Sequence, residues 1–168
     1  GAVERVQKRG GKEYGYDCRK VGRIGTLLMI HRPVLLKEIL EIFNPRPGQI
    51  FIDATINGGG HAHAIAERVG PQGKILGIDW DCDLIRESGI MYKELGVGNI
   101  KLVCESYTNI RNIAERSGMS EVNGILFDLG FSSYHIEQSG RGFSFAKDEP
   151  LDMRYNPSET GLTAGEIV

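Results

Sequence analysis

The chain has 168 residues, of which 40% are hydrophobic and 25% charged, and its formal net charge is −2. These values are typical of one globular domain with its own core, and they argue against a largely disordered chain. The longest apolar runs, residues 24–30 and 34–36, fall far short of the roughly 20 residues that a membrane-spanning helix needs. A transmembrane protein is therefore excluded.

The cysteines indicate the compartment. Cys18, Cys82 and Cys104 are odd in number, widely spaced and without a CxxC motif. This pattern argues against a disulfide framework and against a zinc site. We therefore expect a reducing, cytoplasmic location and no bound metal.

Charge is distributed unevenly along the chain. Residues 1–32 carry eight Lys or Arg against three acidic residues, whereas the remainder carries twelve against nineteen. A basic arm can contact nucleic acid, although a mixed Lys, Arg and Gly tail is more commonly just solvated. The chain starts with Gly1, and Met29 precedes the first organised segment. We expect residues 1–30 to be a basic flexible extension, with Met29 as the natural start.

Helix-like and strand-like segments alternate after this extension. The first helix is expected to start at Pro33 and to end at Asn44 and Pro45. Its apolar face comprises Val34, Leu35, Ile39, Leu40, Ile42 and Phe43. Apolar runs then predict strands at residues 50–52, 75–78, 100–103 and 125–127, and helices between them at 61–69, 83–95 and 109–116.

This alternation predicts the fold class of residues 31–168. Strands joined by helices form a parallel sheet with helices on both faces, an α/β Rossmann-like arrangement. Such sheets bind ligands at the carboxyl ends of their strands. We therefore expect the functional site there.

A glycine-rich turn follows the first strand, in the sequence DATINGGGH from Asp53 to His61. Three consecutive glycines before a helix let backbone N–H groups approach a ligand closely. We expect a cofactor to contact Asp53, Gly58, Gly59, Gly60 and the backbone N–H of His61.

Carboxylates surround this turn. Asp53, Asp79, Asp81 and Asp128 all lie at the ends of predicted strands. They would repel a pyrophosphate and attract a cation, so S-adenosylmethionine fits better than NAD. Asp79 has the spacing of an acid that binds ribose hydroxyls, or alternatively it caps a helix or is a solvated loop acid. Asp81 is expected to cap the next helix.

Aromatic residues accompany the later strands. Tyr107 follows the third strand, where it could stack on adenine or serve as a packed hinge. Residues 129–160 form a long segment without helical periodicity, which is typical of a functional loop. Its Phe131, Phe143 and Phe145 could wall a flat base or simply cover the end of the sheet.

Six ordered motifs carry a resemblance to a known family: HRPVLLKEIL, DATINGGGH, GIDWD, NGILFDLGFSS, RGFSF and EPLDMR. Residues 31–168 resemble the bacterial 16S ribosomal RNA cytosine-N4 methyltransferases, the RsmH or MraW family. The resemblance implies a class I S-adenosylmethionine-dependent fold. It also implies methylation of the exocyclic N4 of a cytidine in the decoding region, with small-subunit rRNA or the assembled subunit as partner.

The resemblance also assigns cofactor contacts, at Gly59, Gly60, His61, Asp79, Tyr107, Asp128 and His135. The family usually has Gln at the place of His135 and commonly Gly at the place of Asn57. Asn is tolerable at Asn57 because it adopts positive φ more readily than other non-glycine residues.

Asp128 is the expected catalytic residue. The cytosine amine is a poor nucleophile, so catalysis should come from positioning it and from accepting its proton. Ser132 and Ser133 could orient the base, and Asp152 and Arg154 could hold its Watson–Crick edge or a phosphate. The full set of expected substrate contacts is Ser132, Ser133, Arg141, Phe143, Asp152 and Arg154.

Family members continue past the end of this sequence with a helical insertion and three more strands. We therefore expect only the first four strands here, with the fourth as an open edge through which the chain could self-associate. Two alternatives to the rRNA enzyme stay open: an inactive remnant that at most binds S-adenosylmethionine or a partner, and a methyltransferase for a DNA or small-molecule amine.

Overall fold

The computed structural model describes residues 33–168. The expectations for the basic extension and for a start at Met29 lie outside the described residues. Over residues 33–168, none of the helices combines the length and the apolar character that crossing a membrane requires.

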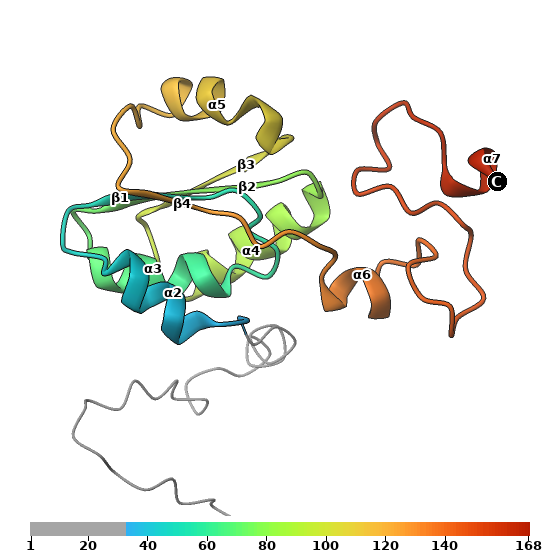
Figure 1. Ribbon diagram of the computed structural model, residues 1–168, viewed down its shortest axis with the longest axis horizontal. Helices are drawn as coiled ribbons and strands as arrows, with labels where there is room; N and C mark the ends of the chain where they lie inside the picture. The colour runs from blue at the N-terminus through green and yellow to red at the C-terminus, as the bar shows by residue number, and fades with distance from the viewer. Residues whose placement is uncertain (1–32) are drawn as a thin grey trace, which may run out of the picture.

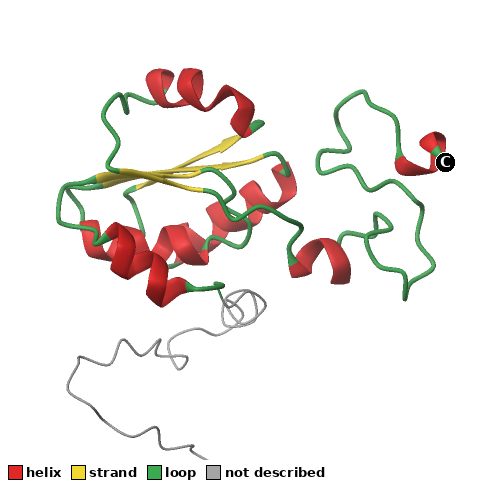
Figure 2. Cartoon of the chain, in the orientation of Figure 1, coloured by secondary structure: helices red, strands yellow, loops and turns green. Residues whose placement is uncertain are grey.

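The centre of the molecule is a parallel sheet (Figures 1 and 2). Its strands are β1 (Ile50–Asp53), β2 (Lys74–Asp79), β3 (Ile100–Cys104) and β4 (Gly124–Leu126), in the order β3-β2-β1-β4. The register sets Asp53 opposite Gly77 and Leu126, and Asp79 opposite Cys104. The carboxyl ends of all four strands therefore meet along one edge, and the prediction of a parallel Rossmann-like sheet is confirmed.

Helices cover both faces of the sheet, as predicted. In Figure 1, α3 and α4 lie on one face with α2 outside them, and α5 lies on the opposite face. The bounds are α2 Leu36–Phe43, α3 Gly60–Val69, α4 Cys82–Glu94, the 3₁₀ helix η2 Tyr107–Asn109, α5 Ile110–Arg116, α6 Ser133–Glu137 and α7 Ala164–Ile167.

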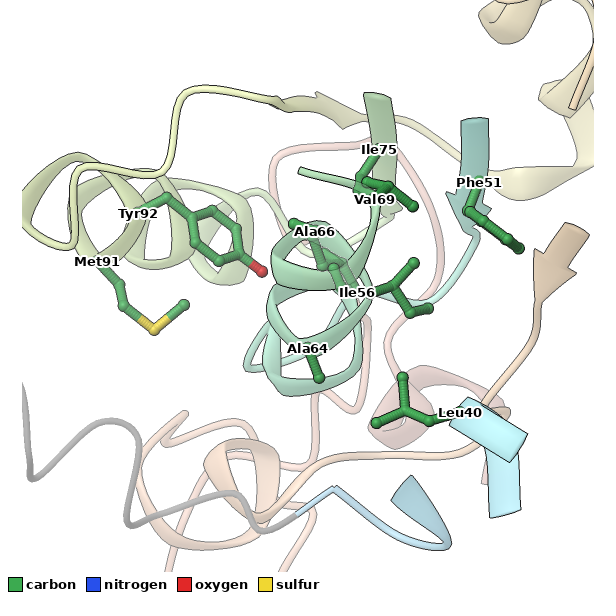
Figure 3. Close-up of a cluster of buried hydrophobic side chains, with 11 residues drawn as sticks. Leu40, Phe51, Ile56, Ala64, Ala66, Val69, Ile75, Met91 and Tyr92 are labelled. Atoms are coloured by element: carbon green, nitrogen blue, oxygen red, sulfur yellow. The ribbon is translucent and has the colours of Figure 1, made fainter. Parts of the chain in front are cut away.

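Alternation along the strands produces two apolar cores. Phe51 and Ile75 face α3 and α4, where Figure 3 shows them around Ile56 and the α3 side chains. Ile52 and Leu76 point to the other face, into a second cluster beneath α5. Strands buried on both faces explain why the strand-forming runs are continuously apolar.

Two predicted boundaries differ from the structure. The first helix starts at Leu36, because Leu35 adopts a left-handed conformation with φ 54° that interrupts a helix from Pro33. Val34 and Leu35, which precede the helix, are exposed, and so is Ile42 within it, so these three are not part of the apolar face. β4 ends at Leu126, so Phe127 lies just beyond the strand.

Residues 127–168 lie beyond the carboxyl end of the sheet and are mostly loop (Figure 2). The helix α6 lies within the segment that we expected to lack helix. The Ser132 side chain caps α6 together with His135, three residues later, and such a local cap leaves no periodic signal in so short a helix.

The expectation of no disulfide is wrong, since Cys82 and Cys104 form one, with their Cα atoms 5.2 Å apart. The physical reason is the strand register. Asp79 pairs with Cys104 across β2 and β3, so Cys82 at the start of α4 lies next to it despite a separation of 22 residues.

Candidate cofactor site

The glycine turn between β1 and α3 is tightly packed against its surroundings. Gly59 has φ 76°, and its carbonyl accepts a hydrogen bond from the Tyr92 hydroxyl at 2.7 Å. A Cβ on Gly59 would lie 2.2 Å from the Tyr92 Oη, and one on Gly60 would lie 2.4 Å from Cγ of Pro33. These glycines are therefore required by the protein's own packing. Asn57 adopts the positive φ, 46°, that the sequence suggested.

Two cavities of about 270 and 230 Å³ lie beside this turn. They share Thr55, Asn57, Leu129 and Gly130, and they therefore form one cleft across the ends of β1 and β4. The first cavity is also lined by Gly58, Gly59, Gly60, His61, Asp128, Phe131, Ser132 and Ser133. The second is also lined by Asp79, Trp80, Tyr107 and Tyr155. Together they have the size of a cofactor site.

Asp79 ends β2 at the wall of the second cavity. Its two carboxylate oxygens accept hydrogen bonds from the backbone N–H groups of Asn57 and Asp81, each at 2.9 Å. Burial raises the pKa of Asp79, while these two backbone donors oppose the rise. The carboxylate is thus held in a fixed position beside the cavity, as a ribose-binding acid requires.

Asp53 lies behind the cleft and lines neither cavity. It is 1% exposed, and Thr55 N–H donates to its Oδ1 at 3.3 Å. Burial raises the pKa of Asp53 to about 7, and the charges of Asp79 and Asp128 add to the rise. The direct contact of Asp53 with a cofactor stays a prediction, and its side chain lies beneath the turn and outside the lining of both cavities.

Asp128 and His61 are neighbours in the lining of the first cavity. The Asp128 side chain is 44% exposed, and its Oδ2 lies 3.8 Å from Nδ1 of His61. The backbone N–H of Asp128 donates to Oγ1 of Thr55 at 2.7 Å, which fixes the end of β4 to the end of β1. His61 Nε2 lies 2.9 Å from the carbonyl oxygen of Val34. Asp128 is therefore an accessible carboxylate on an anchored backbone.

Tyr107 opens η2 on the far side of the second cavity. It is 41% exposed and meets Phe127 edge-on, with ring centroids 5.6 Å apart. An aromatic ring that lines a cavity while supported from one edge can stack on a flat ligand.

Asp81 caps α4 as predicted, accepting from the N–H groups of Asp83 and Leu84. It also accepts from His135 Nε2 at 3.1 Å and from Arg141 Nη1 at 2.6 Å. Burial opposes ionisation of Asp81, but the hydrogen bonds from His135 and Arg141 outweigh it and lower the pKa of Asp81. His135, expected at the cofactor, is fully buried behind the cleft wall, and Arg141, expected at the substrate, is 7% exposed.

The other expected substrate residues are spread out. Asp152 and Arg154 pair with each other, with Nη2 and Oδ2 at 2.7 Å, and the hydrogen bond from Arg154 lowers the pKa of Asp152 to about 2. Phe143 packs on His135 with centroids 5.0 Å apart. Phe131 lines the first cavity, whereas Phe145 is fully exposed. The structure therefore brings Ser132 and Ser133 to the cleft, but not these two charged residues or Phe143.

Sequence reasoning missed several cleft residues, among them Thr55, Trp80 and Tyr155. Thr55 and Trp80 lie inside the motifs DATINGGGH and GIDWD, so their position after a strand was an available signal. Tyr155 reaches the cleft only through the path of the 129–160 segment, which nothing in the local sequence specifies.

The comparisons with known proteins agree with this geometry. The family model described as the MraW methylase family matches residues 28–168. The chain belongs to the MraW methylase family. The family predicted from the motifs is thereby confirmed, and with it S-adenosyl-L-methionine as the cofactor of the family.

Curated relatives of this MraW-family chain are called ribosomal RNA small subunit methyltransferase H. The protein of Dictyoglomus thermophilum is 44% identical over 140 residues, which are 83% of this chain and 46% of that protein. The protein of Syntrophotalea carbinolica is 38% identical over 138 residues, 82% of this chain and 43% of that protein. The chain thus spans a little under half the length of these relatives.

Solved structures similar to the MraW-family chain include a SAM-dependent methyltransferase from Aquifex aeolicus, 17% identical, with TM-score 0.42 over 49% of this chain and 47% of that one. Another is a putative rRNA methylase from Clostridium thermocellum, 20% identical, with TM-score 0.44 over 49% and 45% of the two chains.

The cleft fits the cofactor of the family on its own chemistry. Among residues 33–168, no lysine or arginine lines either cavity, whereas Asp79 and Asp128 both do. Such a lining suits a ligand with cationic groups and disfavours a pyrophosphate. The glycine turn and Asp79 would hold the amino-acid and ribose portions, with Tyr107 beside the adenine.

Proposed function

We propose that this chain provides the cofactor cleft and methyl-transfer centre of an rRNA cytosine-N4 methyltransferase. The substrate would be the exocyclic amine of a cytidine in the decoding region of 16S rRNA, presented in the cytoplasm by the small subunit or its precursor. The observation that carries the proposal is the accessible carboxylate of Asp128, anchored at the end of β4 beside the glycine turn.

S-adenosyl-L-methionine supplies an electrophilic methyl group when bound. The residues of the chain position the amine and receive its proton. As the N4–methyl bond forms and the sulfur–methyl bond breaks, N4 becomes cationic and loses a proton. Asp128 is the acceptor, because its carboxylate is exposed to the cleft and stabilises the positive charge before the proton leaves.

The rim of the first cavity supports a flat base as substrate. Phe131 is 55% exposed at that rim, and Ser132 and Ser133 line the wall next to it. An exposed aromatic ring beside hydroxyl groups can stack on a base that has been turned out of its helix while the hydroxyls bond its edge.

The test measures cofactor binding and transfer separately. Calorimetry with S-adenosyl-L-methionine should detect binding, and radiolabelled methyl should pass to small subunits that lack the modification, at N4 of the cytidine. Asp128→Asn should retain most affinity and lose at least about a hundredfold in transfer rate. The matched control, Asp148→Asn on an exposed loop carboxylate, should transfer at the wild-type rate. Full transfer by Asp128→Asn would contradict the role of Asp128.

A second candidate is a chain that binds S-adenosyl-L-methionine without transferring methyl. It is favoured by charge, because residues 33–168 carry twelve Lys or Arg against nineteen Asp or Glu, a poor balance for holding RNA. Binding without transfer to any small-subunit preparation would support this candidate.

A further inference from the structure

One buried carboxylate joins the sheet to the segment that follows β4. Asp81 lies at the start of α4, its side chain is 0% exposed, and it lines neither cavity. Its Oδ2 receives His135 Nε2 at 3.1 Å and Arg141 Nη1 at 2.6 Å. Both donors come from residues 129–160, so Asp81 holds that segment against the start of α4 through two hydrogen bonds.

The His135 branch leads to the first cavity. The backbone N–H of Ser132 donates to Nδ1 of His135 at 2.9 Å, so Nδ1 carries the lone pair and Nε2 carries the hydrogen. That hydrogen is the one donated to Asp81. Because Ser132 and its neighbour Ser133 line the first cavity, the position of this wall depends on Asp81 through His135.

The Arg141 branch leads to the second cavity. Nη1 of Arg141 also donates to the carbonyl oxygen of Tyr155 at 2.9 Å, and Tyr155 lines that cavity. The Arg141 carbonyl accepts a hydrogen bond from Met153 N–H at 2.8 Å. This is a second hydrogen bond between Arg141 and the stretch that contains Met153 and Tyr155. The same carboxylate therefore positions a residue in each cavity wall.

Asp81 is also tied to the cofactor side of the cleft. Its backbone N–H donates to Asp79 Oδ1 at 2.9 Å, and Asn57 of the glycine turn donates to Asp79 Oδ2 at the same distance. A continuous series of hydrogen bonds thus runs from the glycine turn through Asp79 and Asp81 to both walls.

We infer that Asp81, His135 and Arg141 form a positioning cluster that couples cofactor affinity to the order of residues 129–160. None of the three lines the cleft, so each acts through the residues it holds. The inference rests on the proposed cofactor cleft and adds a consequence of it. Because coupling is reciprocal, cofactor binding should also stabilise the segment.

The first test removes the charge of Asp81. Asp81→Asn removes the carboxylate that His135 and Arg141 share and leaves Arg141 only Asp83, whose side chain is 36% exposed, so the segment should be held less firmly. Calorimetry should give an affinity for S-adenosyl-L-methionine at least about tenfold weaker, within the range typical of coupled sites. Amide exchange should accelerate in residues 129–160 and stay unchanged in β1, β2 and β3. Asp148→Asn, an exposed carboxylate of the same segment, is the matched control and should behave as wild type.

The second test separates positioning from simple filling of space. Glutamine at position 135 can accept from Ser132 N–H and donate to Asp81 at the same time, whereas leucine fills the space with no polar atom. His135→Gln should keep the affinity within about threefold, and His135→Leu should weaken it at least about tenfold. Equal affinities of these two variants would overturn the inference, even if Asp81→Asn failed to fold.

The outcomes distinguish the two proposals. A wild-type chain that does not bind S-adenosyl-L-methionine contradicts the proposed cofactor cleft. A wild-type chain that binds it, with unchanged affinity in both Asp81→Asn and His135→Leu, contradicts the positioning cluster alone. Addition of S-adenosyl-L-methionine to the wild type should slow amide exchange in residues 129–160, and an unchanged rate would contradict the coupling.

Discussion

The part of the chain up to β4 and the part after it are stabilised by different forces. In residues 33–126 most of the buried residues are apolar, with Phe51, Ile75 and Leu76 at 1% exposure or less. After Leu126 the buried residues of the described chain are Ser132, His135 and Arg141, all of them polar. Burial of apolar area stabilises a structure without direction, whereas ion pairs and hydrogen bonds act at a few points. The sheet should therefore withstand changes of charge that detach the segment.

The largest expected effect is on the sheet. Phe51→Ala removes a buried ring between α2 and the glycine-turn core and should lower the free energy of unfolding by about 3–5 kcal/mol. Guanidinium unfolding followed by circular dichroism measures this loss. Exposed Phe145→Ala is the control and should change it by less than about 0.5 kcal/mol. If Phe51→Ala and Phe145→Ala lowered the free energy of unfolding by similar amounts, the sheet and the segment after β4 would not differ in how they are stabilised.

The next effect is confined to the segment. Arg141→Met keeps most of the length of the side chain and leaves the buried Asp81 carboxylate without its cationic partner, at a cost on the order of 3 kcal/mol. Native-state hydrogen exchange should assign that cost to residues 129–160 and leave β1 and β2 protected. Loss of protection throughout the sheet would mean that the two parts unfold as one unit.

A pH effect of intermediate size comes from Asp53 beneath the glycine turn. Its folded pKa is raised from 3.8 to about 7, so folding favours the protonated form. The contribution of the Asp53 carboxyl to the free energy of unfolding is fully present below about pH 4 and is lost as pH rises towards 7. Asp53→Asn should stabilise the chain at pH 8 relative to the wild type and flatten the dependence of stability on pH between pH 4 and 7, as measured by urea unfolding. A slope unchanged by the substitution would refute the assignment to Asp53.

The smallest effect concerns a contact between the two parts at their exposed rim. Nε1 of Trp80, the single tryptophan of the sequence, donates to Oε1 of Glu159 at 2.8 Å. Glu159→Ala should cost about 0.5–1 kcal/mol, because Trp80 is 44% exposed and water replaces the acceptor. Tryptophan fluorescence during urea titration reports the change. A decrease in the free energy of unfolding above about 2 kcal/mol would mean that Glu159 holds the segment as strongly as a buried ion pair does.

The sheet was predictable because its signals are local and repeated. The apolar runs at β1 and β2 are separated by a glycine turn and a helix. Two strands joined through a helix in this way are parallel, and the connection between them is right-handed. Asp79 and Asp128 were predictable at the cleft for the same reason, since Asp79 ends β2 and Asp128 lies two residues after the end of β4.

The segment after β4 was not predictable in the same way. Asp81 meets His135 across 54 residues and Arg141 across 60, and no periodicity relates these positions. A charged residue in a loop gives the same local pattern whether it binds a substrate or a buried partner. The sequence therefore indicated that Arg141 and His135 matter, while their actual contacts required the fold.

The bond between Cys82 and Cys104 has a practical consequence for every measurement above. It joins two residues 22 positions apart in a loop that contains α4, and the ends of this loop are close in sequence to Trp80 and Tyr107, which line the second cavity. Samples prepared with and without a reducing agent are therefore two different covalent species, with differently constrained cavity walls. Affinities and stabilities are comparable between variants only when thiol titration gives the same number of free cysteines in each sample.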